Sequence, residues 1–233
     1  VELSGCIMLL SVIIPTLNEQ KTIKNCLGQF PSKSEDLEVI VVDGGSGDFT
    51  KQIIKDYPWI KFIESRPGRA IQMNRGAKEA KGKMLLFLHS DTILPDKGCE
   101  LIEQFVAKGA VWGWFNVRFD DRRVFFQLME KWNNFFTCLL RLPTGDQAIF
   151  VRREVFIDIG DFKEIPLMED LDLARRLRNI SGGWIIKQPV VTSARRWQKK
   201  GFLKTVLLML RLNLSYFLGV PPERLVNLYS IVR

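Results

Sequence analysis

The feature that most constrains the fold is a run of five apolar residues, Met84 to Leu88, which ends abruptly in His89-Ser90-Asp91. A short apolar run with polar boundaries is typical of a strand buried on both faces, as in a parallel α/β sheet. Side chains alternate along a strand, so we expect His89 and Asp91 to point the same way from its carboxyl end. Open α/β sheets bind their ligands at that end.

Asp91 at such a strand end has two interpretations. Its carboxylate could hold a divalent cation against a substrate phosphate, because oxygen ligands suit Mg²⁺ and related ions. It could equally cap the turn into Leu94-Pro95-Asp96, which is a common use of aspartate after a strand. This segment alone does not decide between the two.

Strands and helices alternate over residues 8–91, which indicates βαβ units and a parallel sheet. The sequence predicts buried strands at 9–14, 37–42, 59–64 and 84–88, separated by helices at 22–30, 50–56 and 70–80. Further along, it predicts helices at 99–108 and 125–140 and strands at 111–119 and 184–189. The chain has 233 residues, of which 46% are apolar, so one large α/β domain or two small ones are possible.

Composition excludes some classes of protein. The four cysteines form no Cys-x-x-Cys pair, which favours reduced thiols in a cytoplasmic protein over disulfides or a zinc site. No serine lies in a Gly-x-Ser-x-Gly motif and His89 is the only histidine, so a Ser-His-Asp hydrolase is not expected. Residues 1–7 contain no basic residue, and we expect no signal peptide there.

The net charge of +8 is unevenly distributed. Between Leu173 and Pro222 there are ten basic residues and no acid. A field of one sign attracts phosphate, whether in a nucleotide, a nucleic acid or an anionic membrane. The basic residues do not interleave with an RNA-binding or zinc motif, so we expect no nucleic-acid partner.

The strand at 37–42 ends in Asp43-Gly44-Gly45-Ser46-Gly47-Asp48. An acid followed by glycines indicates a site where a carboxylate meets a ribose or base edge and the backbone approaches the ligand. The alternative is a glycine-rich turn in which Ser46 or Asp48 caps the next helix. No Gly-Lys-[Ser/Thr] follows, so the segment is not a P-loop.

Two later segments are also ambiguous. Glu169, Asp170 and Asp172 open a predicted helix, where the helix dipole is a sufficient reason for acids, although one of them could be a general base. Trp112 and Trp114 lie on one face of a predicted strand, where they could form a sugar-stacking platform or part of the core.

In this order, these pieces resemble a glycosyltransferase of family 2, of the small stand-alone bacterial type. The segments that carry the resemblance are Ser11–Glu19, Val41–Ser46, Leu86–Asp91 and Glu169–Asp172. The resemblance implies an α/β GT-A fold, with a mostly parallel sheet flanked by helices. Its expected parts are a glycosyltransferase domain at 8–200, with nucleotide-binding (8–92) and acceptor (93–200) halves, and a basic, apolar helical tail at 201–233.

The resemblance also implies roles for individual residues. Asp170 resembles the catalytic base with Glu169 as its neighbour, and Asp91 resembles the last acid of the Asp-x-Asp motif that holds Mn²⁺ or Mg²⁺. His89 stands where the first acid would be, as a second candidate ligand, and Ser193 replaces the glutamine of a Gln-x-x-Arg-Trp motif. The implied donor and nucleotide residues are Pro15, Asn18, Glu19, Asp43, Gly44, Arg69, Gln72, Ser90 and Asp91. The implied acceptor and diphosphate residues are Trp114, Asp146, Gln147, Arg195, Arg196 and Trp197.

The function that follows is metal-dependent, inverting transfer of a sugar from a nucleoside-diphosphate sugar, with UDP the expected nucleotide, to a hydroxyl acceptor. A nucleotidyltransferase-like enzyme is the first rival, but such enzymes open with a glycine-rich loop and Pro15–Glu19 contains no glycine. A non-catalytic sugar-nucleotide binder is the second rival, and the presence of both Asp91 and Asp170 counts against it.

Phe202 to Leu218 is apolar but contains Lys204 and Arg211, and it is shorter than the roughly 20 apolar residues that a membrane-spanning helix needs. It could pack on the catalytic domain or a second subunit, or it could lie in a membrane interface. The second possibility would suit a lipid-linked or hydrophobic acceptor. The expected location is the cytoplasm, with possible contact at the inner face of the cytoplasmic membrane.

Overall fold

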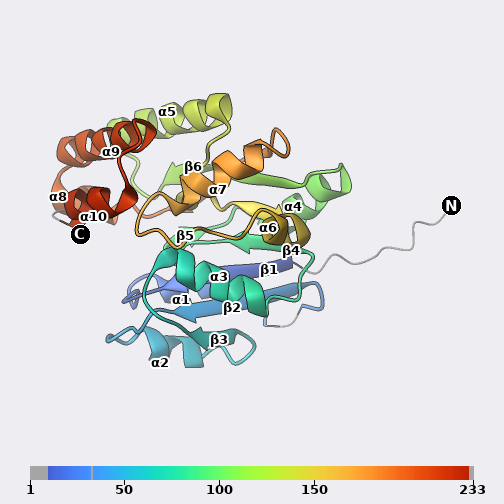
Figure 1. Ribbon diagram of the computed structural model, residues 1–233. Helices are drawn as coiled ribbons and strands as arrows, with labels where there is room; N and C mark the ends of the chain where they lie inside the picture. The colour runs from blue at the N-terminus through green and yellow to red at the C-terminus, as the bar shows by residue number, and fades with distance from the viewer. Residues whose placement is uncertain (1–9, 33, 231–233) are drawn as a thin grey trace.

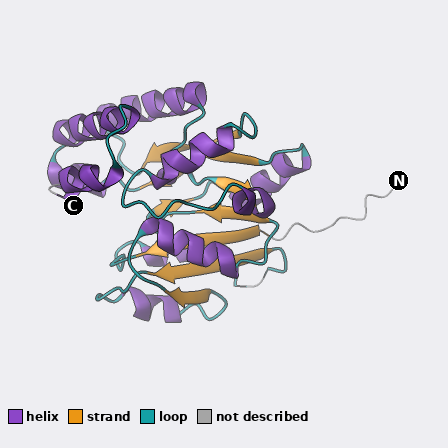
Figure 2. Ribbon diagram, viewed as in Figure 1, coloured by secondary structure: helices purple, strands orange, loops and turns teal. Residues whose placement is uncertain are grey.

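The computed structural model describes residues 10–32 and 34–230, without the side chains of residues 196, 199, 200, 202, 203 and 227–230. Its centre is an eight-stranded sheet in the order β3-β2-β1-β4-β7-β6-β8-β5, with helices on both faces (Figures 1 and 2). The predicted α/β class is therefore confirmed. Leu9, the first residue of the first predicted strand, lies outside the described residues.

The first half of the chain forms the parallel part of the sheet, as its strand–helix alternation predicts. Strands β1 and β2 pair in parallel. Strand β3 pairs in parallel with β2, and β4 pairs in parallel with the other side of β1. The strands are β1 (Leu10–Thr16), β2 (Leu37–Asp43), β3 (Lys61–Glu64) and β4 (Met84–Phe87). The connecting helices are α1 (Ile23–Gly28), α2 (Thr50–Lys55) and α3 (Arg69–Glu79). All four strands consequently point their carboxyl ends at the same edge of the sheet.

The second half adds mixed pairings to the same sheet. Strand β7 is antiparallel to β4 and β6, β8 is parallel to β6, and β5 is antiparallel to β8. Its strands are β5 (Thr92–Ile93), β6 (Trp112–Phe119), β7 (Phe150–Arg152) and β8 (Trp184–Thr192). Its helices are α4 (Gly98–Ala107), α5 (Val124–Leu140), the 3₁₀ turn η1 (Gly145–Gln147), α6 (Arg153–Asp158), α7 (Glu169–Arg178), α8 (Arg195–Lys200), α9 (Phe202–Phe217) and α10 (Pro222–Ser230). The predicted division at residue 92 stays a prediction, since one sheet runs through both halves.

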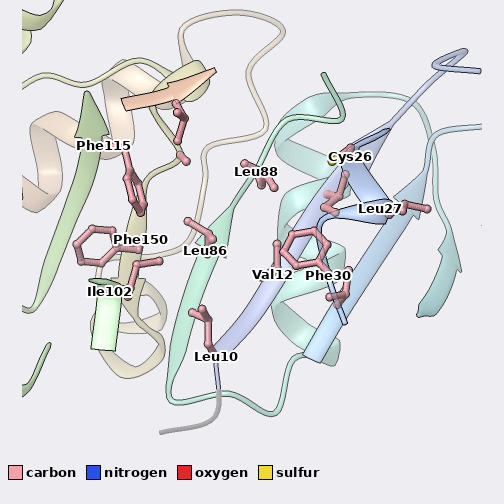
Figure 3. Packing of buried hydrophobic residues seen from close by; sticks show 14 of the residues in the cluster. Leu10, Val12, Cys26, Leu27, Phe30, Leu86, Leu88, Ile102, Phe115 and Phe150 are labelled. Atoms are coloured by element: carbon pink, nitrogen blue, oxygen red, sulfur yellow. The ribbon is translucent and has the colours of Figure 1, made fainter. Parts of the chain in front are cut away.

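Two apolar cores lie on opposite faces of this sheet, because alternate residues of each strand point to opposite faces. On one face, Val12 and Leu86 pack against α1 and α4, with Phe115 and Phe150 continuing the layer (Figure 3). On the other face, Ile13 packs against α3. That helix approaches closely because Gly76 has no side chain: a Cβ there would lie 2.5 Å from Ile13 Cγ2.

Trp114 belongs to the second of these cores and not to an acceptor surface. Trp112 and Trp114 are fully buried, and their ring centroids are 5.3 Å apart. Gly183 covers them so closely that a Cβ at that position would lie 2.7 Å from both rings. The prediction that Trp114 stacks on an acceptor sugar is therefore wrong, since no surface of its ring is open to a ligand.

The chain ends in helices that pack on α7. Leu212 of α9 and Leu225 of α10 are buried against Leu171 and Ala174 of α7. One side of α9 thus contacts the catalytic domain, as one of the two predicted arrangements requires. Among the residues that the structure describes, no helix has the length and apolar content needed to cross a membrane.

Candidate active site

The loops after β1 and β2 are hydrogen-bonded into one wall at the carboxyl edge of the sheet. The backbone N–H of Asn18 donates to Ser46 Oγ (2.8 Å), and Gly47 N–H donates back to Asn18 Oδ1 (2.9 Å). The N–H of Glu19 donates to Thr50 Oγ1 (2.8 Å) at the start of α2. Asn18 has a left-handed φ of 56°, which asparagine tolerates better than most residues. The predicted donor residues Asn18 and Glu19 are therefore fixed relative to the Asp43 loop.

Asp43, at the end of β2, organises its own loop. Its buried Oδ2 accepts hydrogen bonds from the N–H groups of Gly45 (2.9 Å) and Ser46 (2.8 Å). Lys51 Nζ lies 3.7 Å from the same oxygen. The glycine-rich turn that the sequence allows is thus present around Asp43, and Asp48 Oδ1 accepts the N–H of Thr50 (3.0 Å), the first residue of α2. Contact between Asp43 and a nucleoside stays a prediction.

Gln72 has a different role from the predicted donor contact. Its buried amide nitrogen donates to the carbonyl oxygens of Thr16 (2.8 Å) and Val42 (2.7 Å), so both of its N–H bonds are used inside the protein. Gln72, on α3, therefore links the carboxyl ends of β1 and β2. Gly44 leaves room for this amide, because a Cβ there would lie 3.1 Å from it. We therefore correct Gln72 to a positioning residue.

A cluster of two carboxylates and one guanidinium group lies next to the loop after β1, which contributes Glu19. Arg195, the first residue of α8, contacts Glu19 Oε2 and Asp91 Oδ2 with the same Nη2 atom, the latter at 3.4 Å. Thr22 Oγ1 donates to Glu19 Oε2 (2.9 Å). Three residues predicted from distant parts of the chain are thus brought together: one from the β1–α1 loop, one from the end of β4 and one from α8.

This cluster bears on the predicted metal site. No group of three histidine, cysteine or acidic side chains that could hold an ion occurs in the described part of the chain. Two carboxylates nevertheless face one guanidinium nitrogen, so this position already attracts a cation. That donor set fits a divalent ion that takes few protein ligands and completes its shell with phosphate oxygens and water.

Asp170, at the start of α7, lines a small pocket separate from the Glu19–Arg195–Asp91 cluster. The pocket is lined by Arg69, His89, Gly145, Glu169 and Asp170, with Met73, Phe87, Ile149 and Phe162 as its apolar wall. Asp170 Oδ2 accepts the N–H of Gly145 (2.7 Å), and Oδ1 accepts the N–H of Leu171 (2.8 Å). His89 packs against Gly145, where a Cβ would lie 2.7 Å from His89 Nε2.

His89 therefore lies against the Asp170 loop, while Asp91 contacts Arg195. The strand ends at Phe87, and a turn closed by the Thr92 N–H and the His89 carbonyl oxygen (3.0 Å) follows. The simple alternation expected at this strand end is thus interrupted by a turn. The assignment of His89 as a metal ligand stays a prediction.

The environment of Asp170 raises its pKa to about 6. Burial is the main cause and the neighbouring Glu169 carboxylate adds to it, whereas Arg69 and the Gly145 and Leu171 N–H groups oppose the shift. Glu169 itself is buried and paired with Arg69 (3.0 Å). Asp170 is therefore a carboxylate that releases its proton just below neutral pH, as a general base should.

The third acid of this helix has a structural role. Asp172 is buried, and its oxygens contact Lys163 Nζ (3.0 Å) and Arg176 Nε (2.8 Å). The structure thus separates the two interpretations that the sequence leaves open for the acids of this helix. Asp172 stabilises the fold, while Asp170 and Glu169 line a pocket.

Among the predicted residues of the acceptor half, Gln147 is structural, whereas the predicted contacts of Trp197 and Asp146 stay predictions. Gln147 is buried, and its amide donates to Phe115 O and Thr137 Oγ1, both at 3.2 Å, so the prediction that it contacts acceptor is wrong. Trp197 packs edge-on against Phe119, with ring centroids 6.1 Å apart. Asp146 is half-buried in η1.

The remaining predicted residues are Pro15, Ser90 and Arg196. Pro15 is half-buried in β1, and Ser90 is buried in the turn after β4. The side chain of Arg196 lies outside the described part of the chain. For these residues the predicted contacts with donor or acceptor stay predictions.

Two site groups escape the sequence analysis. One is the Gly145 N–H, because a backbone donor has no signature in side-chain chemistry. The other is Lys51, which reaches Asp43 and Glu64 from the first turn of α2. A lysine in a first helical turn is disfavoured by the dipole, so an acid nearby could have been inferred from it.

The sequence of the chain matches known proteins over most of its length. Residues 11–163 match the family model described as "Glycosyl transferase family 2". A curated relative, the PGL/p-HBAD biosynthesis glycosyltransferase of Mycobacterium tuberculosis, is 30% identical over an alignment of 167 residues, and the match covers 65% of this chain and 62% of that protein. The chain thus spans less than two thirds of the length of this relative.

Two solved structures share the fold. Staphylococcus aureus TarS (residues 1–349) in complex with UDP has a TM-score of 0.66 at 22% identity, over 80% of this chain and 60% of that one. The mannosyltransferase PcManGT of Pyrobaculum calidifontis, in complex with GDP-Man and Mn²⁺, has a TM-score of 0.60 at 19% identity, over 97% and 70%. Together with the family match, which covers more than half of the chain, this shows that the protein belongs to glycosyltransferase family 2.

Proposed function

We propose that the protein is an inverting glycosyltransferase that moves a sugar from a nucleoside-diphosphate donor, with UDP as the nucleotide, to an acceptor hydroxyl. The observation that carries this proposal is Asp170: a half-buried carboxylate with a pKa of about 6, in a pocket that His89 also lines, two residues before Asp91 of the Glu19–Arg195–Asp91 cluster. The UDP complex of TarS supports the choice of nucleotide.

The geometry suits a single displacement. An acceptor hydroxyl has a very high pKa, so a base must remove its proton as the oxygen attacks the anomeric carbon. Asp170 takes that proton. The glycosidic bond to the diphosphate breaks as the new bond forms on the opposite face, which inverts the anomeric centre. No second nucleophile is needed.

The departing diphosphate gains negative charge, which cationic groups of this chain would stabilise. Arg195, half-exposed beside Asp91, is placed to move from its two carboxylates onto the phosphates. Arg69 lies beside Asp170 and is paired with Glu169. A divalent cation held by Asp91, with Glu19 nearby, would supply further neutralisation of the diphosphate. The Mn²⁺ in the PcManGT structure supports this assignment.

The acceptor that we propose is lipid-linked or hydrophobic, and the protein would then work at the inner face of the cytoplasmic membrane. Support comes from the basic, apolar tail, in which Lys204 and Arg211 interrupt a run of leucines. One face of α9 packs on α7, and the opposite face carries exposed leucines.

The test is Asp170→Asn, with release of nucleoside diphosphate from UDP-GlcNAc and GDP-Man as the readout. We expect turnover to fall by about 10²–10⁴-fold, as for loss of a general base, while nucleotide binding stays within about twofold. Asp158→Asn, which changes an exposed acid on α6, is the matched control. Turnover near that of the unchanged protein in Asp170→Asn would mean that another group is the base.

The same assay separates the two rivals. A non-catalytic sugar-nucleotide binder would bind the donor without turnover, and Asp170→Asn would change nothing. A nucleotidyltransferase would release pyrophosphate from a nucleoside triphosphate instead of nucleoside diphosphate from the sugar donor. Neither rival explains a carboxylate with a pKa near 6 beside the donor cluster.

A further inference from the structure

Helix α5 exposes a stripe of large apolar side chains. Val124, Leu128, Trp132, Phe135 and Leu139 are spaced at i, i+4, i+8, i+11 and i+15, and each is 61–71% exposed. At 100° per residue these positions fall on one side of the helix. The opposite side holds Phe126 and Thr137, which are buried against the domain. The stripe is thus a second apolar face that the fold does not cover.

Helix α9 has a similar stripe. Leu207, Leu210, Leu214, Phe217 and Leu218 lie on one side of the helix or at its end and are 56–76% exposed. The other side of α9 packs on α7 through Leu212. With Leu140, these two helices carry eleven of the seventeen large apolar side chains that are exposed in the described part of the chain. Single exposed apolar residues are ordinary, but such a concentration marks an interaction surface.

The two helices occupy one edge of the molecule. In Figure 1 both α5 and α9 run along the top, at the opposite end of the molecule from β3. Helix α8 connects them: its Trp197 packs in the same cluster as Phe126 of α5, and its chain continues into α9. Arg195, at the start of α8, contacts Asp91. The exposed stripes and the donor cluster are therefore joined by one short helix.

The charges on these helices are basic where they face solvent. Lys131 on α5 and Lys204 and Arg211 on α9 are exposed, and on each helix they lie at the margin of the apolar stripe. The one acid within the two helices, Glu130, turns back to accept the Phe119 N–H (2.7 Å). Lysine and arginine at the edge of an apolar face can bury their stems and keep their charges at a lipid headgroup.

We propose that the α5–α9 edge, defined by these two stripes, is a docking surface for an anionic lipid bilayer. Apolar stripes with an exposed tryptophan and basic margins match the interfacial region of such a membrane, with acyl chains below and negative headgroups above. A water-soluble partner would not need the basic margin. As a consequence that rests on the proposed function, an acceptor held in the same bilayer reaches the Asp170 cleft along α8.

The test is flotation with vesicles of phosphatidylcholine alone and of phosphatidylcholine mixed with phosphatidylglycerol, whose anionic headgroups give the vesicle a negative surface potential. The chain should float with the anionic vesicles and at least tenfold less with the neutral ones. The variants are Trp132→Ser with Phe135→Ser on α5, and Leu210→Ser with Leu214→Ser on α9. Each pair should lower binding about tenfold. The matched control is Ile157→Ser with Ile180→Ser, two exposed residues elsewhere on the surface, which should bind normally.

Three results would overturn the proposal: no flotation with anionic vesicles, equal loss of binding in the control pair, or binding unaffected by either stripe variant. A stripe-dependent dimer in light scattering, without vesicle binding, would assign the surface to a second copy of the chain instead. Nucleotide-induced thermal shifts are measured on the same variants. Their persistence when flotation is lost shows that the nucleotide site is intact, so this proposal, and with it the membrane-bound acceptor, can fail while sugar transfer from a nucleoside-diphosphate donor stands.

Discussion

At the scale of single residues, the chemistry depends on how Asp170 keeps its charge in a poorly solvated place. Burial and Glu169 raise its pKa, while the helix-terminal N–H of Leu171, the Gly145 N–H and Arg69 prevent the rise from going further. The result is a base that is ionised at neutral pH yet still has affinity for a proton. Three different segments of the chain set this balance.

The dependence of kcat/KM on pH measures the pKa of Asp170 directly. The folded-state pKa of Asp170 is raised, so the carboxyl group is protonated, and inactive as a base, below about pH 6. We predict that kcat/KM falls tenfold per pH unit on the acid side of about pH 6. In Glu169→Gln the like charge is lost, and the acid limb should move down by about half to one pH unit. A limb that stays in place, or moves up, would contradict this account of the Asp170 pKa.

Arg195 is the residue whose position depends most on ligands. Without a donor it neutralises Glu19 and Asp91, so it competes with any divalent cation for those oxygens. We predict that Arg195→Ala binds Mn²⁺ about three- to tenfold more tightly than the unchanged protein in the absence of nucleotide. Nucleotide affinity should fall in the same variant, because a phosphate contact is lost.

Mn²⁺ electron paramagnetic resonance or calorimetry measures both effects. Lys187→Ala, which removes an exposed cation on β8, is the control for net charge. If Mn²⁺ affinity without nucleotide is the same in all three proteins, Glu19 and Asp91 do not form the cation site.

At the scale of elements, the site depends on the strand ends being held in register. Gln72 of α3 fastens the last residues of β1 and β2 with two buried hydrogen bonds. Leucine has a similar volume but cannot donate, so Gln72→Leu removes one donor from each of the two carbonyl oxygens, although Thr16 O keeps the Gly44 N–H (2.9 Å). We predict a loss of about 1–3 kcal/mol in the free energy of unfolding and weaker nucleotide binding. Thermal unfolding measures the first, with Gln52→Leu on the exposed side of α2 as control.

The elements that the sequence predicts well are those whose pattern is local. Val39–Val42 and Met84–Phe87 are continuous apolar runs and therefore predict buried strands, and α3 and α5 have clear helical spacing. Strand β5 has two residues and β7 three, so neither has a period to detect. They exist because β8 and β4 offer them pairing partners, which is a tertiary effect.

The same distinction explains the site. Asp91 and Asp170 are noticeable in the sequence as acids at a strand end and at a helix start, whereas Glu19 and Arg195 are identified only through the family resemblance; the roles of all four stay predictions. Trp114, Gln147 and Gln72 are polar or aromatic residues that the fold turned inward, and one sequence does not show which side of a segment is covered. The Gly145 N–H needed coordinates, since its partner is 25 residues away.

At the scale of the whole molecule, one sheet supports both groups of predicted site residues. Its parallel part ends in the loops of the donor cluster, and its mixed part carries η1, α7 and α8, which hold Asp170 against Gly145 and Arg195 against Asp91. Because α8 leads directly into α9, the Glu19–Arg195–Asp91 cluster and the α5–α9 edge are built on adjacent segments (Figure 1). The central claim is that the Glu19–Arg195–Asp91 cluster binds a nucleoside diphosphate through Asp91.

The most direct measurement is the thermal shift produced by UDP, GDP, ADP and CDP, each with and without Mn²⁺. The proteins are the unchanged chain, Asp91→Ala, and Asp96→Ala as a control in an exposed acid five residues away. We predict that UDP with Mn²⁺ raises the unfolding temperature of the unchanged chain and of Asp96→Ala, and that the shift is absent in Asp91→Ala. No shift with any nucleotide, or a full shift in Asp91→Ala, would contradict the account.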